Sequence, residues 1–322
     1  MSRTLTEESR ATLYEATLRS LQAEVKELPA VWLYDERGSR LYEEITRLPD
    51  YYLPRREGEI LSARAAGIAS RTQASTLVEL GAGNAKNTRL LLEALESAGT
   101  LERFVPLDVS EQTLRESAEQ IAVAYPGISV EPIVGDFERD LDLLPAGGRR
   151  LIAFLGSTIG NLCPDQRASL LSALAEALAP GDALLLGVDL VKDVARLEAA
   201  YNDPQGVTEA FVRNALTAVN RDLDARFEQR RFVYEARWDP KHEWMNIGFR
   251  AREAHAVSVR RLGIELTFRR DEPLRVEISS KFRRESFELE AARAGLRVES
   301  WWTDHAGDFA VTLLFPDPFA GS

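Results

Sequence analysis

The 322-residue chain is poor in the residues that form disulfides and metal sites. Its one cysteine, Cys163, cannot form an internal disulfide, and its three histidines lie too far apart in the sequence for a local metal-binding motif. We therefore expect no metal ion in this protein, and we expect Cys163 to act as a small packing residue.

The chain also lacks long apolar runs and an excess of basic residues. No run approaches the roughly 20 apolar residues that span a bilayer, and the start, MSRTLTEESR, lacks the apolar segment of a signal peptide. The 51 acidic side chains outnumber the 40 basic ones, and the resulting formal charge of −11 would repel a nucleic-acid backbone. These absences predict a cytoplasmic protein with neither a membrane nor a nucleic-acid partner.

Between about residues 76 and 188, apolar strand-like runs alternate with helical patterns. The pattern predicts strands at 76–80, 103–109, 129–137, 150–156 and 182–190, and helices at 110–125 and 164–180. An alternation of strands and helices is typical of a parallel, doubly wound sheet. We therefore expect an α/β fold in this part of the chain.

A different pattern follows residue 190 and predicts a second architecture. Helical segments at 191–203 and 207–223 precede stretches typical of antiparallel strands at 230–240, 243–254, 256–270 and 274–282. A helix at 283–296 and a strand pair at 297–304 and 309–315 complete the chain. We expect a nucleotide-type core of residues 56–191 and 282–322, with a mixed α/β lobe of residues 1–55 and 192–281 that includes an N-terminal helix at 7–25.

The stretch LVELGAGNAKNTRLLLEAL, residues 77–95, leads from the first predicted strand through two glycines into a helix. Gly81 and Gly83 leave room for backbone N–H groups to approach a ligand at the start of the helix. A dinucleotide fingerprint would need a third glycine at the position of Lys86, so an NAD-dependent oxidoreductase is disfavoured. Taken alone, the turn could equally be structural.

Acidic residues end the next two predicted strands. Asp108 could accept hydrogen bonds from both hydroxyls of a ribose, or it could cap the following helix. Asp136 could accept from an adenine amino group while Phe137 covers the ring, or the two could be a turn residue and a core residue. Because ligands bind at the carboxyl ends of parallel strands, these features together resemble the class I methyltransferases that use S-adenosylmethionine.

A sharper resemblance is carried by FLGSTIGNL at 154–162, with WLYDERGSRLYEEITRLPDYY upstream and VEISSKF downstream. Their order and spacing, from about residue 30 to the terminal WWTDHAGDFAVTLL, are similar to those of the histidine-specific Nα-methyltransferase family. Its best-known members make the trimethylated histidine hercynine, the first intermediate of ergothioneine biosynthesis. The resemblance implies a class I S-adenosylmethionine-dependent methyltransferase (Rossmann-like) core with an inserted mixed α/β substrate-binding lobe.

The resemblance also implies the residues of the site. Around S-adenosyl-L-methionine it places Tyr34, Gly81, Asp108, Asp136 and Phe137. Around the amino acid it places Tyr51, Gly156, Asn161, Tyr201, Glu277 and Ser279, with Asn161 and Tyr51 in the catalytic roles. The chemistry suits these roles, because Asn161 can bond both the amine and the carboxylate, and the Gly156 carbonyl can orient the amine.

Specificity is expected at the other end of the substrate. The strand period places Glu277 and Ser279 on one face of their strand, which without the resemblance would be a solvated face. The resemblance implies that they bond the imidazole, and a carboxylate without its partner would then disfavour phenylalanine or leucine. Ile247 stands where the well-known members have a methionine near the imidazole, and in the glycine loop the common lysine of the family aligns with Asn87.

The sequence therefore predicts a monomeric enzyme that trimethylates the α-amine of L-histidine through its mono- and dimethylated forms. One alternative is the same reaction on another aromatic amino acid, although Glu277 disfavours indole. Another is a non-catalytic S-adenosylmethionine-binding regulator, which the retained Asn161 and Tyr201 disfavour.

Overall fold

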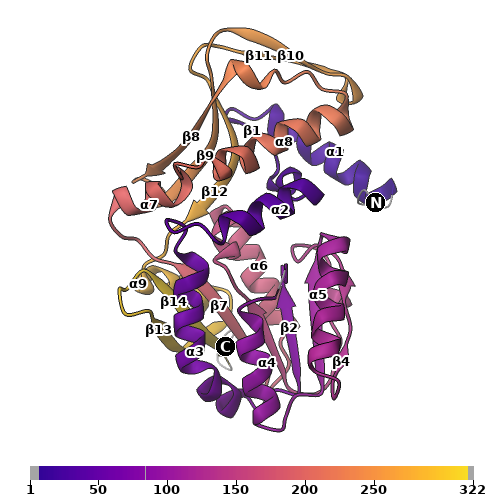
Figure 1. Ribbon diagram of the computed structural model, residues 1–322, viewed down its shortest axis with the longest axis vertical. Coiled ribbons are helices and arrows are strands. Elements are labelled where there is room, and N and C mark those ends of the chain that lie inside the picture. The colour runs from indigo at the N-terminus through magenta and orange to yellow at the C-terminus, as the bar shows by residue number, and fades with distance from the viewer. Residues whose placement is uncertain (1–6, 84, 318–322) are drawn as a thin grey trace. The chain divides into compact units, whose positions relative to one another are not determined.

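A computed structural model describes residues 7–83 and 85–317, without the side chains of residues 7–10. The chain divides into two compact units. We call Tyr52–Lys192 with Ser280–Ser322 the core unit, and Met1–Tyr51 with Asp193–Ser279 the lobe unit (Figure 1). The assignment of the units to a cofactor and to a substrate stays a prediction.

The sequence predicts neither a membrane-spanning segment nor a signal peptide. Among the helices of the described residues, none is long and apolar enough to cross a membrane. The first six residues of the stretch MSRTLTEESR lie outside the described residues.

The core unit is a doubly wound α/β structure, as the alternating pattern predicts. Its helical elements are α3 (Leu53–Thr72), α4 (Thr88–Ser97), α5 (Glu111–Ala124), η2 (Leu141–Leu143), η3 (Thr158–Asn161), α6 (Pro164–Ala177) and α9 (Arg284–Arg293). Its strands are β2 (Thr76–Leu80), β3 (Arg103–Asp108), β4 (Ser129–Val130), β5 (Ile133–Val134), β6 (Arg150–Phe154), β7 (Ala183–Asp189), β13 (Leu296–Thr303) and β14 (Phe309–Pro316).

These strands form one sheet in the order β13-β14-β7-β6-β2-β3-β4, with β5 also paired to β3. Strands β3, β2, β6 and β7 are parallel, whereas β14 runs antiparallel to both β7 and β13. The order reverses between β2 and β6, and such a switch point is where open α/β sheets bind ligands at the carboxyl ends of their strands. The topology therefore directs attention to the turns that follow β2 and β6.

Helices cover both faces of this sheet. Side chains of α6 and α9 share one buried apolar cluster with Val78 and Leu80 of β2. Because side chains alternate along a strand, Glu79 lies on the opposite face, where its carboxylate meets Thr88 of α4. Helices α3 and α4 lie side by side on that face (Figure 1).

A buried ion-pair cluster lies within the core unit at the end of β7. The Asp189 carboxylate accepts hydrogen bonds from the Tyr52 hydroxyl at 2.9 Å and from Lys281 Nζ at 2.8 Å, and it also pairs with Lys192. The chain passes between the units after Tyr51, Lys192 and Ser279, so each partner lies next to one of these points. The cluster therefore joins the three ends of the core unit's segments to one carboxylate.

The lobe unit has a different organisation. Its helical elements are α1 (Glu7–Leu21), η1 (Ala30–Leu33), α2 (Glu36–Ile45), α7 (Val194–Tyr201), α8 (Val207–Leu223), η4 (Gln229–Arg231) and η5 (Arg260–Leu262). Strands β1 (Lys26–Glu27), β12 (Pro273–Ser280), β9 (Trp244–Ala251) and β8 (Phe232–Asp239) form one sheet in that order. Strands β10 (His255–Val259) and β11 (Ile264–Phe268) form a separate antiparallel pair.

Helices α2 and α8 of the lobe unit lie side by side (Figure 1) and are joined by a polar contact. Asp35 caps α2 by accepting from the Gly38 N–H, and its carboxylate also accepts from Asn214 of α8 at 2.6 Å. In the neighbouring sheet, a Cβ at Gly248 would lie 2.3 Å from the Leu274 carbonyl oxygen. Glycine is therefore required for the close approach of β9 and β12.

The structure corrects some of the predicted elements. The single strand predicted at 129–137 is wrong, because β4 and β5 are separate two-residue strands on either side of Pro132. Proline has no N–H to donate to a ladder, so it interrupts the pairing. Helices α2 and α3 have no predicted counterpart, and the stretch 256–270 is a hairpin rather than one strand.

Candidate active site

The glycine turn and Asp108 lie together at the carboxyl ends of β2 and β3. Gly81 and Gly83 have φ values of +68° and +49°, which glycine adopts without strain. The Gly83 N–H donates to Asp108 Oδ2 at 2.9 Å, and the Ser110 N–H donates to Oδ1 at 2.8 Å. Asp108 therefore fixes both the glycine turn and the start of α5.

Asp136 and Phe137 follow the short strand β5. A Cβ at Gly81 would lie 4.0 Å from the Phe137 ring, so this ring is next to the glycine turn. Phe137 also packs against Phe154, with ring centroids 4.8 Å apart. Asp136 accepts from the Glu138 N–H at 3.0 Å. Asp136 thus has the contact of a turn residue, and Phe137 has the contacts of a core residue. Phe137 also borders the predicted cofactor site.

Glu79, one residue before the end of β2, is a candidate site residue that was not predicted from the sequence. It is buried; one carboxylate oxygen accepts from Thr88, and the other has no hydrogen-bond partner among the described residues. Burial, with Glu57 and Asp108 nearby, raises the pKa of Glu79 to about 8. Its signal in the sequence is an acidic residue inside an otherwise apolar strand.

These residues fit S-adenosylmethionine by their chemistry. A carboxylate has about four acceptor positions, so Asp108 can accept from ligand hydroxyls as well as from backbone N–H groups. The unpaired oxygen of Glu79 suits an ammonium donor. The carboxylates, the glycine turn and the Phe137 ring thus supply the hydrogen-bonding and apolar groups that an adenosyl amino acid requires.

Gly156 and Asn161 lie on one loop after β6. Gly156 has a φ of +72°, and its N–H donates to Glu57 Oε1 at 2.7 Å. The Ser157 hydroxyl accepts from the Asp189 N–H at 3.0 Å. A Cβ at Gly160 would lie 2.9 Å from the Ser280 carbonyl oxygen, so the loop also passes close to that segment. The loop that carries both predicted substrate residues is therefore fixed at several points.

The lobe unit brings together three of the predicted substrate residues. The hydroxyls of Tyr201 and Ser279 are 2.9 Å apart, and the Tyr51 ring meets the Tyr201 ring edge-on at 6.0 Å. All three are buried. Burial, together with a hydrogen bond to Tyr42, raises the pKa of Tyr51 well above its usual value. Tyr51 therefore keeps its proton at neutral pH.

Glu277 and Ile247 lie on the adjacent strands β12 and β9 of the lobe unit. Ile247 is buried, whereas Glu277 is half-buried and Ser279 is 4% exposed. Tyr234 Oη donates to the Tyr201 carbonyl oxygen at 2.6 Å, and burial with the nearby Glu277 charge raises the pKa of Tyr234. The Glu277–Ser279 face is therefore not a simple solvated surface.

Tyr34 belongs to the lobe unit, whereas the other predicted cofactor residues belong to the core unit. Its ring packs edge-on against Tyr42 at 5.9 Å and Phe211 at 5.5 Å. Two further tyrosines contact the predicted site residues of the lobe unit but were not predicted from the sequence: Tyr42 packs against Tyr34, and Tyr234 bonds the Tyr201 carbonyl oxygen. The sequence carries no signal for which of its tyrosines meet in the fold.

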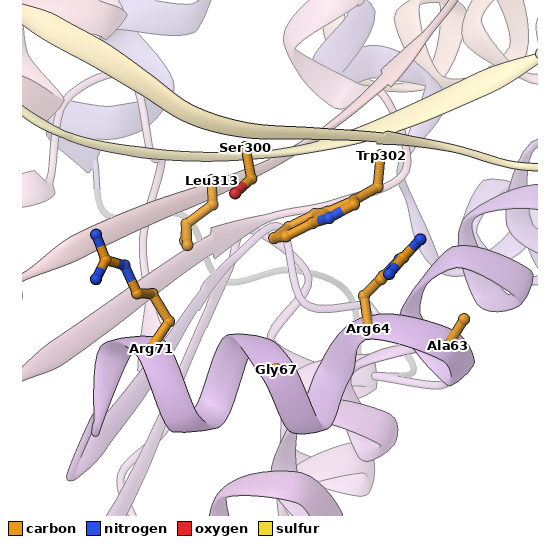
Figure 2. Close-up of a pocket in the computed structure, with 7 residues that line it drawn as sticks. All are labelled: Ala63, Arg64, Gly67, Arg71, Ser300, Trp302 and Leu313. Carbon is orange, nitrogen blue, oxygen red and sulfur yellow. The ribbon is translucent and has the colours of Figure 1, made fainter.

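Two other features of the core unit hold none of the predicted site residues. A groove between α3 and the β13–β14 hairpin is lined by Trp302, Ser300 and Leu313 on one side and by α3 on the other (Figure 2). Glu59, Asp304 and His305 bring possible metal ligands within 4.8 Å of one another. Arg56 pairs with both Glu59 and Asp304, so their negative charge already has a cationic partner.

The strand order of the core unit, its glycine turn and the acids beside it define a class I S-adenosylmethionine-dependent methyltransferase. The family described as histidine-specific, SAM-dependent methyltransferases matches residues 13–316. The chain is 50% identical over 293 residues to the histidine N-alpha-methyltransferase of Mycolicibacterium smegmatis, and 49% identical over 293 residues to that of Mycobacterium tuberculosis. Both alignments cover 91% of this chain and 91% of the relative.

A more distant relative is the Ergothioneine biosynthesis protein 1 of Neurospora crassa. It is 32% identical over 296 residues, which cover 90% of this chain and 33% of that protein. Because the family match extends over most of the chain, this protein belongs to the histidine-specific, S-adenosylmethionine-dependent methyltransferases.

Proposed function

We propose that this protein transfers methyl groups from S-adenosylmethionine to the α-amine of L-histidine. Up to three successive transfers would give hercynine, the first step of ergothioneine biosynthesis. The main support is the identity of 50% and 49% to two histidine N-alpha-methyltransferases over 91% of each chain. We also propose that the enzyme acts as a monomer in the cytoplasm, and light scattering on the purified protein checks the monomer.

The proposed reaction is an in-line displacement at the methyl group of the cofactor. S-adenosylmethionine supplies a methyl group on a positively charged sulfur. Positioning supplies most of the rate in such a displacement, so the protein must hold a neutral amine in line. In our proposal the Asn161 side chain and the Gly156 carbonyl orient the amine, and the Tyr201 hydroxyl donates to the substrate carboxylate.

The amine must lose a proton before it can accept a methyl group. Because its pKa is raised, Tyr51 is protonated at neutral pH, so in our proposal its hydroxyl is a hydrogen-bond partner of the amine and does not take its proton. We therefore propose that Tyr51 and Asn161 select the neutral amine by hydrogen bonding, and that its proton leaves to solvent.

Glu277 and Ser279 are proposed to bond the two ring nitrogens of the substrate. An imidazole N–H that donates to Glu277 would satisfy a carboxylate that an aliphatic or phenyl side chain leaves without a partner. A site built to hydrogen-bond its substrate strongly rejects analogues that lack the donor. Ile247, on the adjacent strand, supplies the apolar wall.

Mass spectrometry on the purified protein, incubated with S-adenosylmethionine and an equimolar mixture of the common amino acids, tests this function. We expect loss of histidine and the appearance of its trimethylated form. Selective methylation of another aromatic amino acid would support the cofactor assignment and contradict the histidine assignment. Ile247 would then be the first residue to replace in a specificity test. Cofactor binding without any methylation would leave the protein as a regulator.

A further inference from the structure

Glu57 is a buried acid on α3 that the proposed mechanism does not use. Its side chain connects two segments that lie far apart in the sequence. Glu57 Oε1 accepts from the Gly156 N–H at 2.7 Å, and Oε2 accepts from Asn87 Nδ2 at 2.9 Å. Gly156 lies on the loop after β6 that carries the predicted substrate residues, and Asn87 ends the glycine loop. One carboxylate therefore bonds both loops.

The surrounding structure leaves a place for this carboxylate. A Cβ at Gly187 of β7 would lie 2.2 Å from Glu57 Oε1, so only glycine leaves space there. Asn87 Nδ2 also donates to the Pro54 carbonyl oxygen at 3.0 Å, which attaches the glycine loop to the first turn of α3. Glycine on one side and an amide on the other therefore define the position of Glu57.

The burial of Glu57 lowers the stability of the folded protein. Glu57 is 2% exposed, and burial raises its pKa to about 7 despite the two hydrogen bonds. The other acid nearby, Glu79, is also buried, and its negative charge would act against that of Glu57. A buried acid with no cationic partner among the described residues destabilises the fold, and such costs are concentrated at functional sites.

We propose that Glu57 is a positioning residue, which holds the Gly156 peptide and the end of the glycine loop in the geometry that methyl transfer requires. The inference rests on the proposed function. Glu57 acts through Gly156 and Asn87 rather than on the reacting atoms. Its loss should therefore lower kcat more than it raises KM, because misplacement of about 1 Å can reduce a rate by about 10²-fold.

The test uses Glu57→Gln, which keeps the volume of the side chain. Glutamine has one acceptor oxygen, so its NH2 group must face either the Gly156 N–H or the Asn87 amide. We expect kcat for histidine to fall by about 10-fold to 10²-fold, and KM to change by less than about threefold. The matched control is Glu59→Gln, an exposed position on the same helix, for which both constants should stay within about twofold of wild type.

Hydrogen exchange on the ligand-free variants separates positioning from stability. In Glu57→Gln, protection should fall in the peptides that contain Asn87 and Gly156 and stay unchanged elsewhere in the core unit. A kcat within twofold of the control, or a loss of protection throughout the core unit, would overturn the proposal. If the variant does not fold, Asn87→Ala replaces it, and unchanged kcat and local protection would then have the same meaning.

A reciprocal exchange provides a rescue. In Glu57→Gln combined with Asn87→Asp, the oxygen of the introduced glutamine can accept from the Gly156 N–H while its NH2 group donates to the introduced carboxylate. We expect this double variant to recover part of the lost kcat, although Asn87→Asp itself removes the bond to the Pro54 carbonyl oxygen. A double variant that is slower than Glu57→Gln contradicts the two-bond account.

Wild-type activity separates this proposal from the proposed function. If wild type methylates another amino acid, the histidine assignment fails, and the Glu57→Gln ratios are measured on that amino acid. If wild type methylates none, S-adenosylhomocysteine binding decides on Glu57. A roughly 10-fold weaker Kd in the variant would support a hold on the glycine loop, and an unchanged Kd would reject it.

Discussion

The core unit contains two kinds of buried acid, and they differ in their partners. Asp189 is 0% exposed and meets Lys192, Lys281 and the Tyr52 hydroxyl. Although burial opposes ionisation, the lysines lower the pKa of Asp189. Glu57 and Glu79 are also buried, at 2% and 4% exposed, but have only neutral donors, and burial raises their pKa values to about 7 and about 8.

The comparison shows that partners, rather than depth, decide what a buried acid does. The Asp189 carboxylate has two cationic partners, so it serves as a permanent attachment for Tyr52, Lys192 and Lys281. Glu57 and Glu79 lie next to the switch point of the sheet. Among the described residues, no cation lowers the pKa of either acid. A site that destabilises the empty protein can recover that free energy from a bound ligand.

Asp189→Asn should have the largest effect on stability. It leaves two buried lysines without their carboxylate, and breaking such a pair lowers the free energy of unfolding by about 3–5 kcal/mol. Because the pKa of Asp189 is lowered, its contribution is present above the unfolded pKa and lost only at acidic pH, so the full loss should be seen at pH 6. Urea unfolding measures it, with the exposed Asp142→Asn as control.

Glu277→Gln extends the comparison to an acid of the lobe unit. A hydrogen bond from imidazole to a charged acceptor is stronger than one to a neutral amide. We expect kcat/KM for histidine to fall by about 10²-fold with little change in Tm. The control is Glu265→Gln, an exposed position on β11. Steady-state kinetics with unchanged kcat/KM would show that Glu277 does not bond the substrate.

Glu79→Gln should change how stability depends on pH. The pKa of Glu79 is raised in the folded protein, so the folded state binds the proton more tightly and loses stability as pH rises from about 5 to about 8. Glutamine removes this loss, and the variant should exceed wild type by about 2 kcal/mol at pH 6.5 while nearly matching it at pH 5. Urea unfolding at both pH values decides, with the exposed Glu93→Gln as control.

Lys192→Met should have the smallest effect. Burial lowers the pKa of Lys192, and Asp189 keeps Lys281 and Tyr52 when Lys192 is replaced by an apolar chain of similar length. We expect a loss of about 1 kcal/mol in the free energy of unfolding. Added to Asp189→Asn, the same change should restore stability by removing one unpaired lysine. A double variant less stable than Asp189→Asn would contradict the charge argument.

Much of the fold is predictable because its elements have strong local patterns. Strand β2 is predicted at 76–80 and found at Thr76–Leu80, and α8 is predicted at 207–223 and found at Val207–Leu223. The break at Pro132 was readable from its missing N–H. Helices α2 and α3 were missed although α3 carries Leu53, Ile60, Leu61 and Ile68 at helical spacing.

The site could be predicted only where motifs mark it. The glycine turn and the acids at strand ends have fixed positions along the chain, so Gly81, Asp108 and Asp136 could be named in advance. Glu57 could not be named, because its partner Gly156 lies 99 positions away. The roles of the named residues stay predictions that the variants above test.

The sequence by itself determined the doubly wound core, the family and the order of the motifs, because these depend on local periodicity and on spacing along the chain. Only the tertiary structure decided which buried acids meet lysines and which meet neutral amides. That choice depends on contacts between distant segments: Lys281 reaches Asp189, whereas Asn87 and Gly156 reach Glu57. The ionisation of a buried acid follows from those partners, which no local pattern of residues specifies.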